Sequence, residues 1–183
     1  MDITDDKDIL EAFRDVEKRD YAFNLLVRKY SPRLYSHIRK MVNSHDEADD
    51  LLQNTLIKIW RSLPDFREDS GLYTWLYRIA TNETLNFLRR ERLRCSLSLT
   101  SYSSLVDSRL EADENFDGDE IQRKLYLAVR KLPPKQMAVF NLKYFEDLKY
   151  EEIVAILGGT VGSLKASYHH ALAKIKASLE NTD

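Results

Sequence analysis

The sequence predicts an all-α protein made of two small helical domains joined by a flexible acidic linker. Apolar residues recur at steps of three and four over most of the chain, and no segment alternates apolar and polar residues as a half-buried strand does. Between residues 96 and 119 this helical pattern stops, and Ser, Asp and Glu replace the large apolar side chains. We therefore expect one domain at residues 1–95, a linker at 96–119 and a second domain at 120–183.

Length and composition limit the classes of protein to consider. A chain of 183 residues has room for one medium or two small domains, and 43% hydrophobic residues suffice for packed cores. No apolar run approaches the roughly 20 residues that span a bilayer, and the acidic start MDITDDKDILEAF lacks the features of a signal peptide. A single cysteine, Cys95, excludes an internal disulfide. These features predict a cytoplasmic protein with no membrane insertion.

Charge is distributed unevenly along the chain. The overall net charge is −2, which by itself argues against nucleic-acid binding. Residues 1–95 are neutral with 17 basic and 17 acidic side chains, residues 96–120 carry −6, and residues 121–183 carry +4. A neutral block and a basic block joined by an acidic segment leave nucleic-acid binding open for each block.

The N-terminal domain shows three helical stretches. The first covers about residues 23–41, where Pro32 is expected to start or kink a helix. The second covers residues 48–60 and ends at Leu63–Pro64, and the third opens at Leu72.

The C-terminal domain ends in a helix-turn-helix pattern. Helical periodicity resumes at Ile121 and is interrupted at Pro133–Pro134, where Pro134 suits the first turn of the next helix. The stretches 150–157 and 161–179 are separated by Gly158–Gly159, which allow the positive φ of a sharp turn. Thr160 is placed to cap the last helix.

Residues on the outer face of that last helix are small or polar, as major-groove binding requires. The alternative is an ordinary helical hairpin with a solvated face. His169 and His170 also raise metal ligation, but adjacent helical side chains point about 100° apart and do not share one ion comfortably. The residues that lie off the buried stripe are Gly162, Ser163, Lys165, Ala166, Ser167, His169 and His170.

Two long motifs resemble a known family. HDEADDLLQNTLIKIW, followed by FREDSGLYTWLYRIATNETLNFLRRERLR, resembles region two of bacterial RNA polymerase sigma factors. LPPKQMAVFNLKYFEDLKYEEIVAILGGTVGSLKASYHHAL resembles region four. No region three lies between them, and this layout is similar to that of the extracytoplasmic-function group within the sigma-70 family.

The resemblance implies a sigma factor that binds core RNA polymerase and directs promoter-specific transcription initiation in response to an extracytoplasmic or stress signal. Its implied partners are core polymerase, promoter DNA and an anti-sigma factor, and it implies no cofactor, no metal and no catalytic residue. A stand-alone helix-turn-helix regulator is the main alternative, but it explains only residues 120–178. An enzyme is a weaker alternative, because we find no nucleophile–base set, phosphate loop or metal-ligand spacing.

The first site that the resemblance implies is a contact with the polymerase clamp. Carboxylates along one side of a helix suit a basic partner surface, although a solvated acidic face near a helix N-terminus has the same composition. The residues expected at this contact are Asp46, Asp49, Asp50 and Gln53.

The second implied site reads the minus-ten promoter element. Aromatic and basic side chains on one surface suit exposed bases, because rings stack on bases and cations bind phosphates. The spacing of Trp75 from Leu76 and Ile79 also fits a core position, and arginines at a helix end also suit the helix dipole. The expected residues are Asp69, Ser70, Trp75, Arg78, Asn82, Asn86, Arg89 and Arg90.

The third implied site reads the minus-thirty-five element through the last helix. Compared with relatives, Asn86 replaces a common aspartate in the minus-ten helix, and Lys149 replaces a typical Ser or Thr cap. The recognition helix is also less cationic than usual, which indicates greater dependence on the polymerase for affinity. In relatives the acidic linker threads into the RNA path of the polymerase. The residues expected to read the minus-thirty-five element are Ser163, Lys165, Ser167, His169 and His170.

Overall fold

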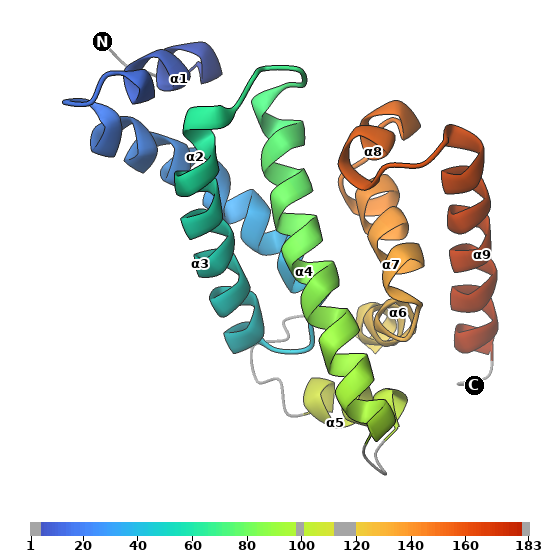
Figure 1. Cartoon of the computed structure of the whole chain (residues 1–183). Helices are drawn as coiled ribbons and strands as arrows, with labels where there is room; N and C mark the ends of the chain where they lie inside the picture. Colours follow the sequence, from blue (N-terminus) through green and yellow to red (C-terminus); the bar gives the residue numbers. More distant parts are fainter. Residues whose placement is uncertain (1–4, 98–100, 112–119, 181–183) are drawn as a thin grey trace.

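The computed structural model describes residues 5–97, 101–111 and 120–180, and within these ranges it contains helices and no strand (Figure 1). The all-α prediction is therefore confirmed. The α-helices are α1 (Asp6–Arg14), α2 (Arg19–Arg39), α3 (His45–Ser62), α4 (Leu72–Leu97), α5 (Tyr102–Glu111), α6 (Glu120–Arg130), α7 (Pro134–Phe140), α8 (Tyr150–Leu157) and α9 (Val161–Glu180). Short turns of 3-10 helix, η1 (Leu63–Asp65), and π-helix, η2 (Asn141–Phe145), follow α3 and α7.

Helices α1 to α4 form the N-terminal bundle. α1 lies across α2, and α2, α3 and α4 pack on one another. α1 was not predicted, because its acidic sequence hides a short apolar face formed by Ile9, Leu10 and Phe13, which are all buried. An aromatic cluster completes the contact: the Phe13 ring meets Trp60 of α3 edge-on at 5.4 Å between centroids.

Of the two outcomes expected at Pro32, a helix start is wrong, because α2 runs through this residue, and a kink stays a prediction. Proline removes one backbone hydrogen bond from a helix interior. Leu26 and Tyr30 before the proline and Leu34 and Ile38 after it are each at most 4% exposed and belong to one core. Packing on both sides of Pro32 outweighs the lost hydrogen bond.

Helices α6 to α9 form the C-terminal part. Pro134 begins α7, as predicted from the proline pair. α7 and α6 pack on α9, and α8 packs on α9 across the turn at Gly158–Gly159. Both glycines have positive φ, 72° and 89°, which confirms the prediction for this turn.

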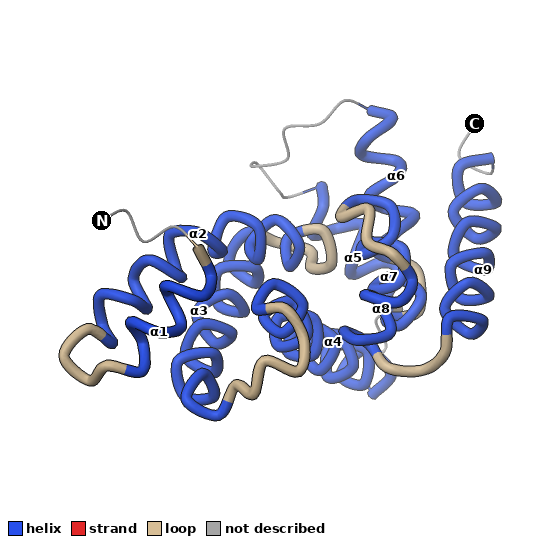
Figure 2. The backbone as a smooth tube through the Cα atoms, turned by 90° about the horizontal axis from the view of Figure 1, so that it is seen from above, coloured by secondary structure: helices blue, strands red, loops and turns tan. Residues whose placement is uncertain are grey.

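Helix α4 joins the two halves of the molecule, because it is buried on two sides. Figure 2 shows α4 between α3 and α8, and it packs on α2, α3, α7 and α8. One apolar cluster includes Leu76 and Ala80 of α4 together with Leu142, Ile153 and Ile156 of the C-terminal half. The two halves therefore share a core in this arrangement.

Polar contacts accompany this shared core at Glu146, which lies between η2 and α8. Its carboxylate accepts a hydrogen bond from the Tyr77 hydroxyl at 3.0 Å and pairs with Lys40 at 3.3 Å. The Lys40 and Glu146 side chains are only 17% and 14% exposed, and the Lys40 ammonium also lies 4.8 Å from the centre of the Phe145 ring. A partly desolvated charge pair of this kind fixes how the halves fit together.

A helix lies within the segment that we predicted as an irregular linker. α4 continues past residue 95 to Leu97, and α5 occupies Tyr102–Glu111. Val106 of α5 is fully buried, and the Arg92 guanidinium lies 4.3 Å from the centre of the Tyr102 ring. These tertiary contacts stabilise a helix whose sequence has little apolar periodicity. The rest of the expected linker, residues 98–100 and 112–119, lies outside the described residues, and the domain boundaries stay a prediction.

We expect Glu146→Ala to weaken the packing between the halves. The substitution removes the acceptor of the Tyr77 hydrogen bond and leaves the mostly buried Lys40 ammonium without its carboxylate partner. The expected cost in stability is about 1–3 kcal/mol. Chemical denaturation and limited proteolysis of the purified chain measure the effect. Asp147→Asn is the control, because this neighbouring carboxylate is 95% exposed and Asn also tolerates its left-handed backbone, with φ of 50°. Equal stability of the two variants would contradict the structural role of Glu146.

His37 gives a second prediction, on pH. Burial lowers its pKa from 6.5 to about 4, since desolvation disfavours the charged ring; Glu146 opposes the shift and Lys40 adds to it. Its Nε2 lies 2.9 Å from the Thr81 hydroxyl. Between pH 6.5 and pH 4 the unfolded chain binds a proton that the folded chain does not, so stability falls on acidification by up to about 1.4 kcal/mol per pH unit. Denaturation of His37→Gln over this range should show a slope smaller by about one proton, and an unchanged slope would contradict the assignment.

Candidate nucleic-acid interface

The predicted partner-binding face of α3 begins at a well-formed helix start. The Ser44 hydroxyl accepts a hydrogen bond from the Glu47 amide at 3.2 Å, and the Glu47 carboxylate accepts from the Ser44 amide at 3.3 Å. The Glu47 carboxylate is thus engaged in the cap of the helix. The neighbouring carboxylates are left to point outward.

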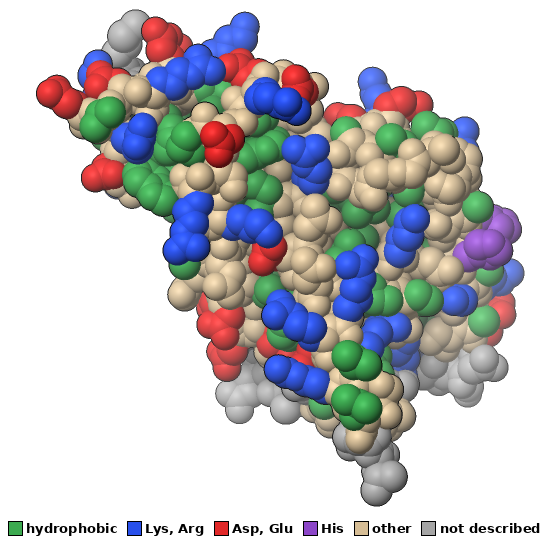
Figure 3. Space-filling model, viewed as in Figure 1, with side chains coloured by type: hydrophobic (Ala, Val, Ile, Leu, Met, Phe, Trp, Pro, Cys, Tyr) green, Lys and Arg blue, Asp and Glu red, His purple; other side chains and the backbone are tan. Residues whose placement is uncertain are grey.

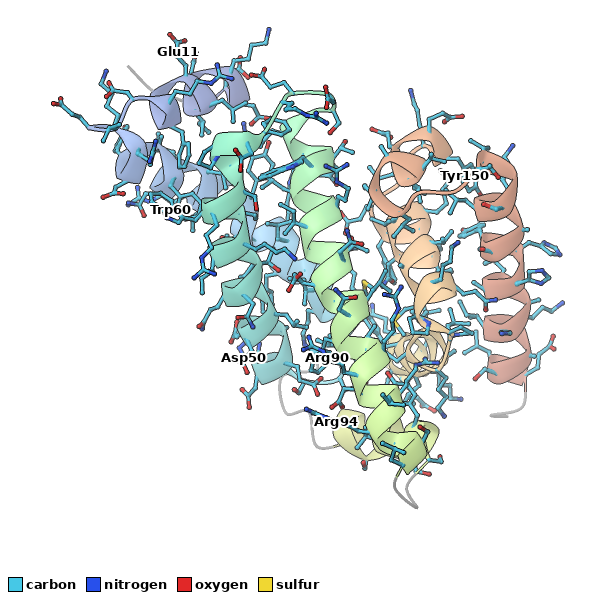
Figure 4. All side chains as sticks on the ribbon, viewed as in Figure 1. Glu11, Asp50, Trp60, Arg90, Arg94 and Tyr150 are labelled. Atoms are coloured by element: carbon cyan, nitrogen blue, oxygen red, sulfur yellow. The ribbon has the colours of Figure 1, made fainter. Side chains whose placement is uncertain are left out.

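The four residues predicted for this face lie on the side of α3 away from the core. Leu51 on the opposite side is buried, and α3 packs there on α2 and α4. Asp49 is about half exposed and lies 3.5 Å from Nε2 of His45. Figure 4 shows Asp50 at the outer edge of α3. The other exposed members of the predicted set are Asp46, Asp50 and Gln53.

A pocket of about 380 Å³ lies where the loop before α4 meets the first turns of that helix. The structure brings four of the predicted minus-ten residues together there, and adds four that we did not predict. Trp75 is 7% exposed and its ring lies tilted against the Phe66 ring, with 4.9 Å between centroids, so it is mainly a core residue that also lines the pocket. The predicted members are Asp69, Ser70, Trp75 and Arg78, and the additional ones are Asp65, Phe66, Arg67 and Ala155.

The remaining predicted minus-ten residues lie outside the pocket, along the exposed side of α4. Asn82, Asn86, Arg89 and Arg90 are all exposed and continue the line from Arg78 at helical spacing. The Arg89 guanidinium donates to the Asn86 side-chain oxygen at 3.1 Å, which orients both groups. Basic side chains follow α4 down the face seen in Figure 3, and Figure 4 places Arg90 and Arg94 on its lower half.

Helix α9 starts with reciprocal hydrogen bonds between Thr160 and Ser163. The Ser163 amide donates to the Thr160 hydroxyl at 3.2 Å, and the Thr160 amide donates to the Ser163 hydroxyl at 3.1 Å. The predicted cap at Thr160 is confirmed. The Ser163 hydroxyl also donates to the Thr160 carbonyl at 2.8 Å, so this side chain is largely engaged in the cap.

The outer face of α9 carries the other residues predicted for the minus-thirty-five element. Lys165, His169 and His170 are exposed, and the Lys165 ammonium lies 5.7 Å from the centre of the Tyr150 ring in α8. Ser167 is half-buried and donates its hydroxyl to the Ser163 carbonyl at 2.9 Å. The face is thus presented by a helix fixed at its start by the cap and buried at Leu164, Ala171 and Ile175.

The described residues contain neither a cluster of metal-binding side chains nor a helix that is long and apolar enough to cross a membrane. Within residues 5–97, 101–111 and 120–180, His, Cys, Asp and Glu form no group of three or more that could hold a metal ion. In the same ranges, every helix is too short or too polar to cross a membrane.

Comparison with known proteins identifies both halves. The family description "Sigma-70 region 2" matches residues 26–94, and "Sigma-70, region 4" matches residues 122–175. The chain is 31% identical to the RNA polymerase sigma-H factor of Pseudomonas aeruginosa, over 96% of this chain and 94% of that protein. It is 34% identical to the ECF RNA polymerase sigma-E factor of Escherichia coli K12, over 85% and 86% of the two chains.

Solved structures show the same fold. The sigma factor RpoE of Bartonella quintana, in complex with the anti-sigma factor NepR, superposes with a TM-score of 0.66 at 22% identity and covers 86% of this chain and 96% of its own. CnrH in complex with the cytosolic domain of CnrY gives the same TM-score and identity, with 97% and 100% covered. The chain belongs to the sigma-70 family of RNA polymerase sigma factors, in its extracytoplasmic-function group. Its function is therefore to direct transcription initiation, and a stand-alone regulator is not favoured.

Proposed function

We propose that this sigma factor divides its work among three surfaces: the outer face of α3 binds core polymerase, the pocket and exposed side of α4 read the minus-ten element, and the outer face of α9 reads the minus-thirty-five element. The observation that carries the proposal is the pocket before α4, because it unites two aromatic rings, two guanidinium groups, two carboxylates and a serine hydroxyl around a space large enough for a base. The protein supplies no catalytic residue in this scheme and needs no cofactor; the polymerase performs the chemistry.

The setting of this activity is part of the proposal. We place the protein in the cytoplasm, where core polymerase and promoter DNA lie, and propose that it responds to an extracytoplasmic or stress signal. Both structural neighbours were solved as complexes. RpoE of Bartonella quintana is bound to the anti-sigma factor NepR, and CnrH is bound to the cytosolic domain of CnrY. By analogy, an anti-sigma factor is the proposed partner that keeps this chain inactive.

Transcription with purified components tests the proposal as a whole. The purified chain and core polymerase are incubated with DNA selected by the reconstituted holoenzyme, and transcripts are mapped. Initiation at a defined distance from two selected elements supports the proposal. Selective DNA binding by the chain without any gain in specific initiation would instead favour a stand-alone regulator.

The α3 surface gives a prediction on polymerase binding. We expect Asp50→Lys to weaken core binding by about 2–5 kcal/mol, because it removes a charge contact and adds repulsion against a basic partner. The fold should survive, since this side chain is exposed. Titration of labelled core polymerase measures the affinity. Glu180→Lys, which reverses an exposed charge on α9, is the control, and an Asp50→Lys variant with wild-type affinity would refute the assigned surface.

The α9 surface gives a prediction on DNA. Lys165→Ala should lower the affinity of holoenzyme for the minus-thirty-five element, and if the lysine contacts phosphate the salt dependence should fall by about one counterion. Binding to DNA that carries this element is measured at several salt concentrations. Lys176→Ala serves as the control, because Lys176 is also exposed but pairs with Glu180 near the end of α9. Identical affinity, salt slope and base preference in Lys165→Ala would show that the lysine is only solvated.

A further inference from the structure

The loop before α4, residues 66–71, forms most of one wall of the pocket but has little internal structure. Its two ends are fixed: the Phe66 amide donates to the Leu63 carbonyl at 3.2 Å, and the Gly71 carbonyl accepts from the Trp75 amide at 3.1 Å. At its centre, Glu68 adopts a left-handed conformation with φ of 59°, which a non-glycine residue adopts only when its surroundings hold it there.

Helix α1 reaches this loop from outside the residues that the region two description matches. The region two match begins at residue 26, whereas α1 ends at Arg14. The Arg14 guanidinium donates to the Glu68 carboxylate at 2.5 Å, so the last turn of α1 contacts the centre of the loop. In Figure 1, α1 and the loop between α3 and α4 lie at the same end of the N-terminal bundle.

An apolar contact supports the same connection. Phe66 lines a second cavity, of about 160 Å³, together with Leu10 and Phe13 of α1. The Phe66 ring also contacts the Trp75 ring at a tilt of 42°, and both residues line the pocket before α4. Phe66 is therefore a layer between α1 and the pocket, so a displacement of α1 changes the packing of the pocket wall.

α1 is itself held in a defined place, as a positioning element must be. At its start, the Asp6 carboxylate accepts a hydrogen bond from the Tyr30 hydroxyl at 2.7 Å and pairs with Lys29 at 2.7 Å. Toward its end, the buried Phe13 ring packs against Trp60 of α3, and Figure 4 shows Glu11 pointing away from the bundle. The apolar side of α1 thus faces the bundle, and Arg14 extends from a fixed helix.

We propose that α1 sets the shape of the base-reading loop, with Arg14 as a positioning residue that acts through Glu68 and never touches DNA. This inference rests on the proposed minus-ten function of the pocket. It assigns part of the base preference to a helix that precedes the residues matched by the region two description. Loss of the Arg14–Glu68 pair frees the centre of the loop, which lowers the selectivity of the pocket among bases more than it lowers the overall stability of the fold.

Charge reversal on assembled holoenzyme tests the proposal. The probe is a DNA duplex whose minus-ten element lies in an open bubble, prepared with each base in turn at every position of the element. An exposed ion pair contributes about 0.2–1 kcal/mol, so Arg14→Glu, and likewise Glu68→Arg, should weaken binding to the preferred sequence by up to about fivefold and flatten the base preference. The combined Arg14→Glu and Glu68→Arg variant should restore both affinity and preference to within about twofold of the original protein.

Lys18→Glu is the matched control. Lys18 also pairs with a carboxylate, Asp15 at 3.1 Å, and its side chain is 65% exposed, compared with 66% for Arg14. The substitution changes the net charge equally but lies away from the loop, and it should leave the base preference unchanged. Core binding of every variant should match that of the original protein, and thermal unfolding should change much less than the base preference does.

The outcomes separate this proposal from the function on which it rests. If the original holoenzyme shows no base preference at any position of the bubble, the proposed minus-ten role of the pocket is wrong. If it shows a preference that Arg14→Glu leaves intact, or that the combined charge swap fails to restore, the positioning role of α1 is overturned while the minus-ten role stands. A loss of preference in Arg14→Glu that is matched by Lys18→Glu would reduce the effect to net charge and also overturn the proposal.

Discussion

The structure depends on the burial of α4 on two sides. A helix that lies on the surface of a bundle needs one apolar stripe, whereas α4 buries Trp75, Leu76, Tyr77 and Ala80 within two turns. One side of this set faces α2 and α3, and the other side faces α7 and α8. The same helix also presents its exposed side to DNA in the proposed function. Base-reading side chains therefore stand on a rigid support whose neighbours come from both ends of the chain.

The sequence predicts the helices whose apolar residues are strongly periodic. It does not predict the helices that form mainly because of contacts with other parts of the chain. α3, the opening of α4 and the turn at Gly158–Gly159 follow from apolar spacing and from glycine conformation. α1 and α5 have short or interrupted apolar faces, and each is stabilised by a few contacts with another helix. Phe13 of α1 contacts Trp60 of α3, and Tyr102 of α5 contacts Arg92 of α4. The continuous α2 shows the same effect, because packing on both sides of Pro32 overrides a local signal.

The same distinction between local pattern and tertiary contact applies to the residues of the candidate site. Motif resemblance and residue type locate Asp69, Ser70, Trp75 and Arg78, since these residues are close in the sequence and are also close in space. Ala155 lines the same pocket from a helix about 80 positions later in the chain, and no local pattern connects the two segments. Glu146 was missed for the same reason: its partners, Lys40 and Tyr77, are about 106 and 69 positions away.

The presence of Ala155 in the pocket wall means that a motion of α8 away from α4 would open one side of the pocket. If a nucleotide bound only those molecules in which α8 had moved off α4, the apparent dissociation constant would be the intrinsic one divided by the fraction of such molecules. An interface that favours the packed arrangement by about 2.7 kcal/mol leaves about 1% of molecules apart and weakens apparent binding about a hundredfold. Substitutions between the halves can therefore tune the concentration at which the chain becomes active without altering any residue that faces DNA.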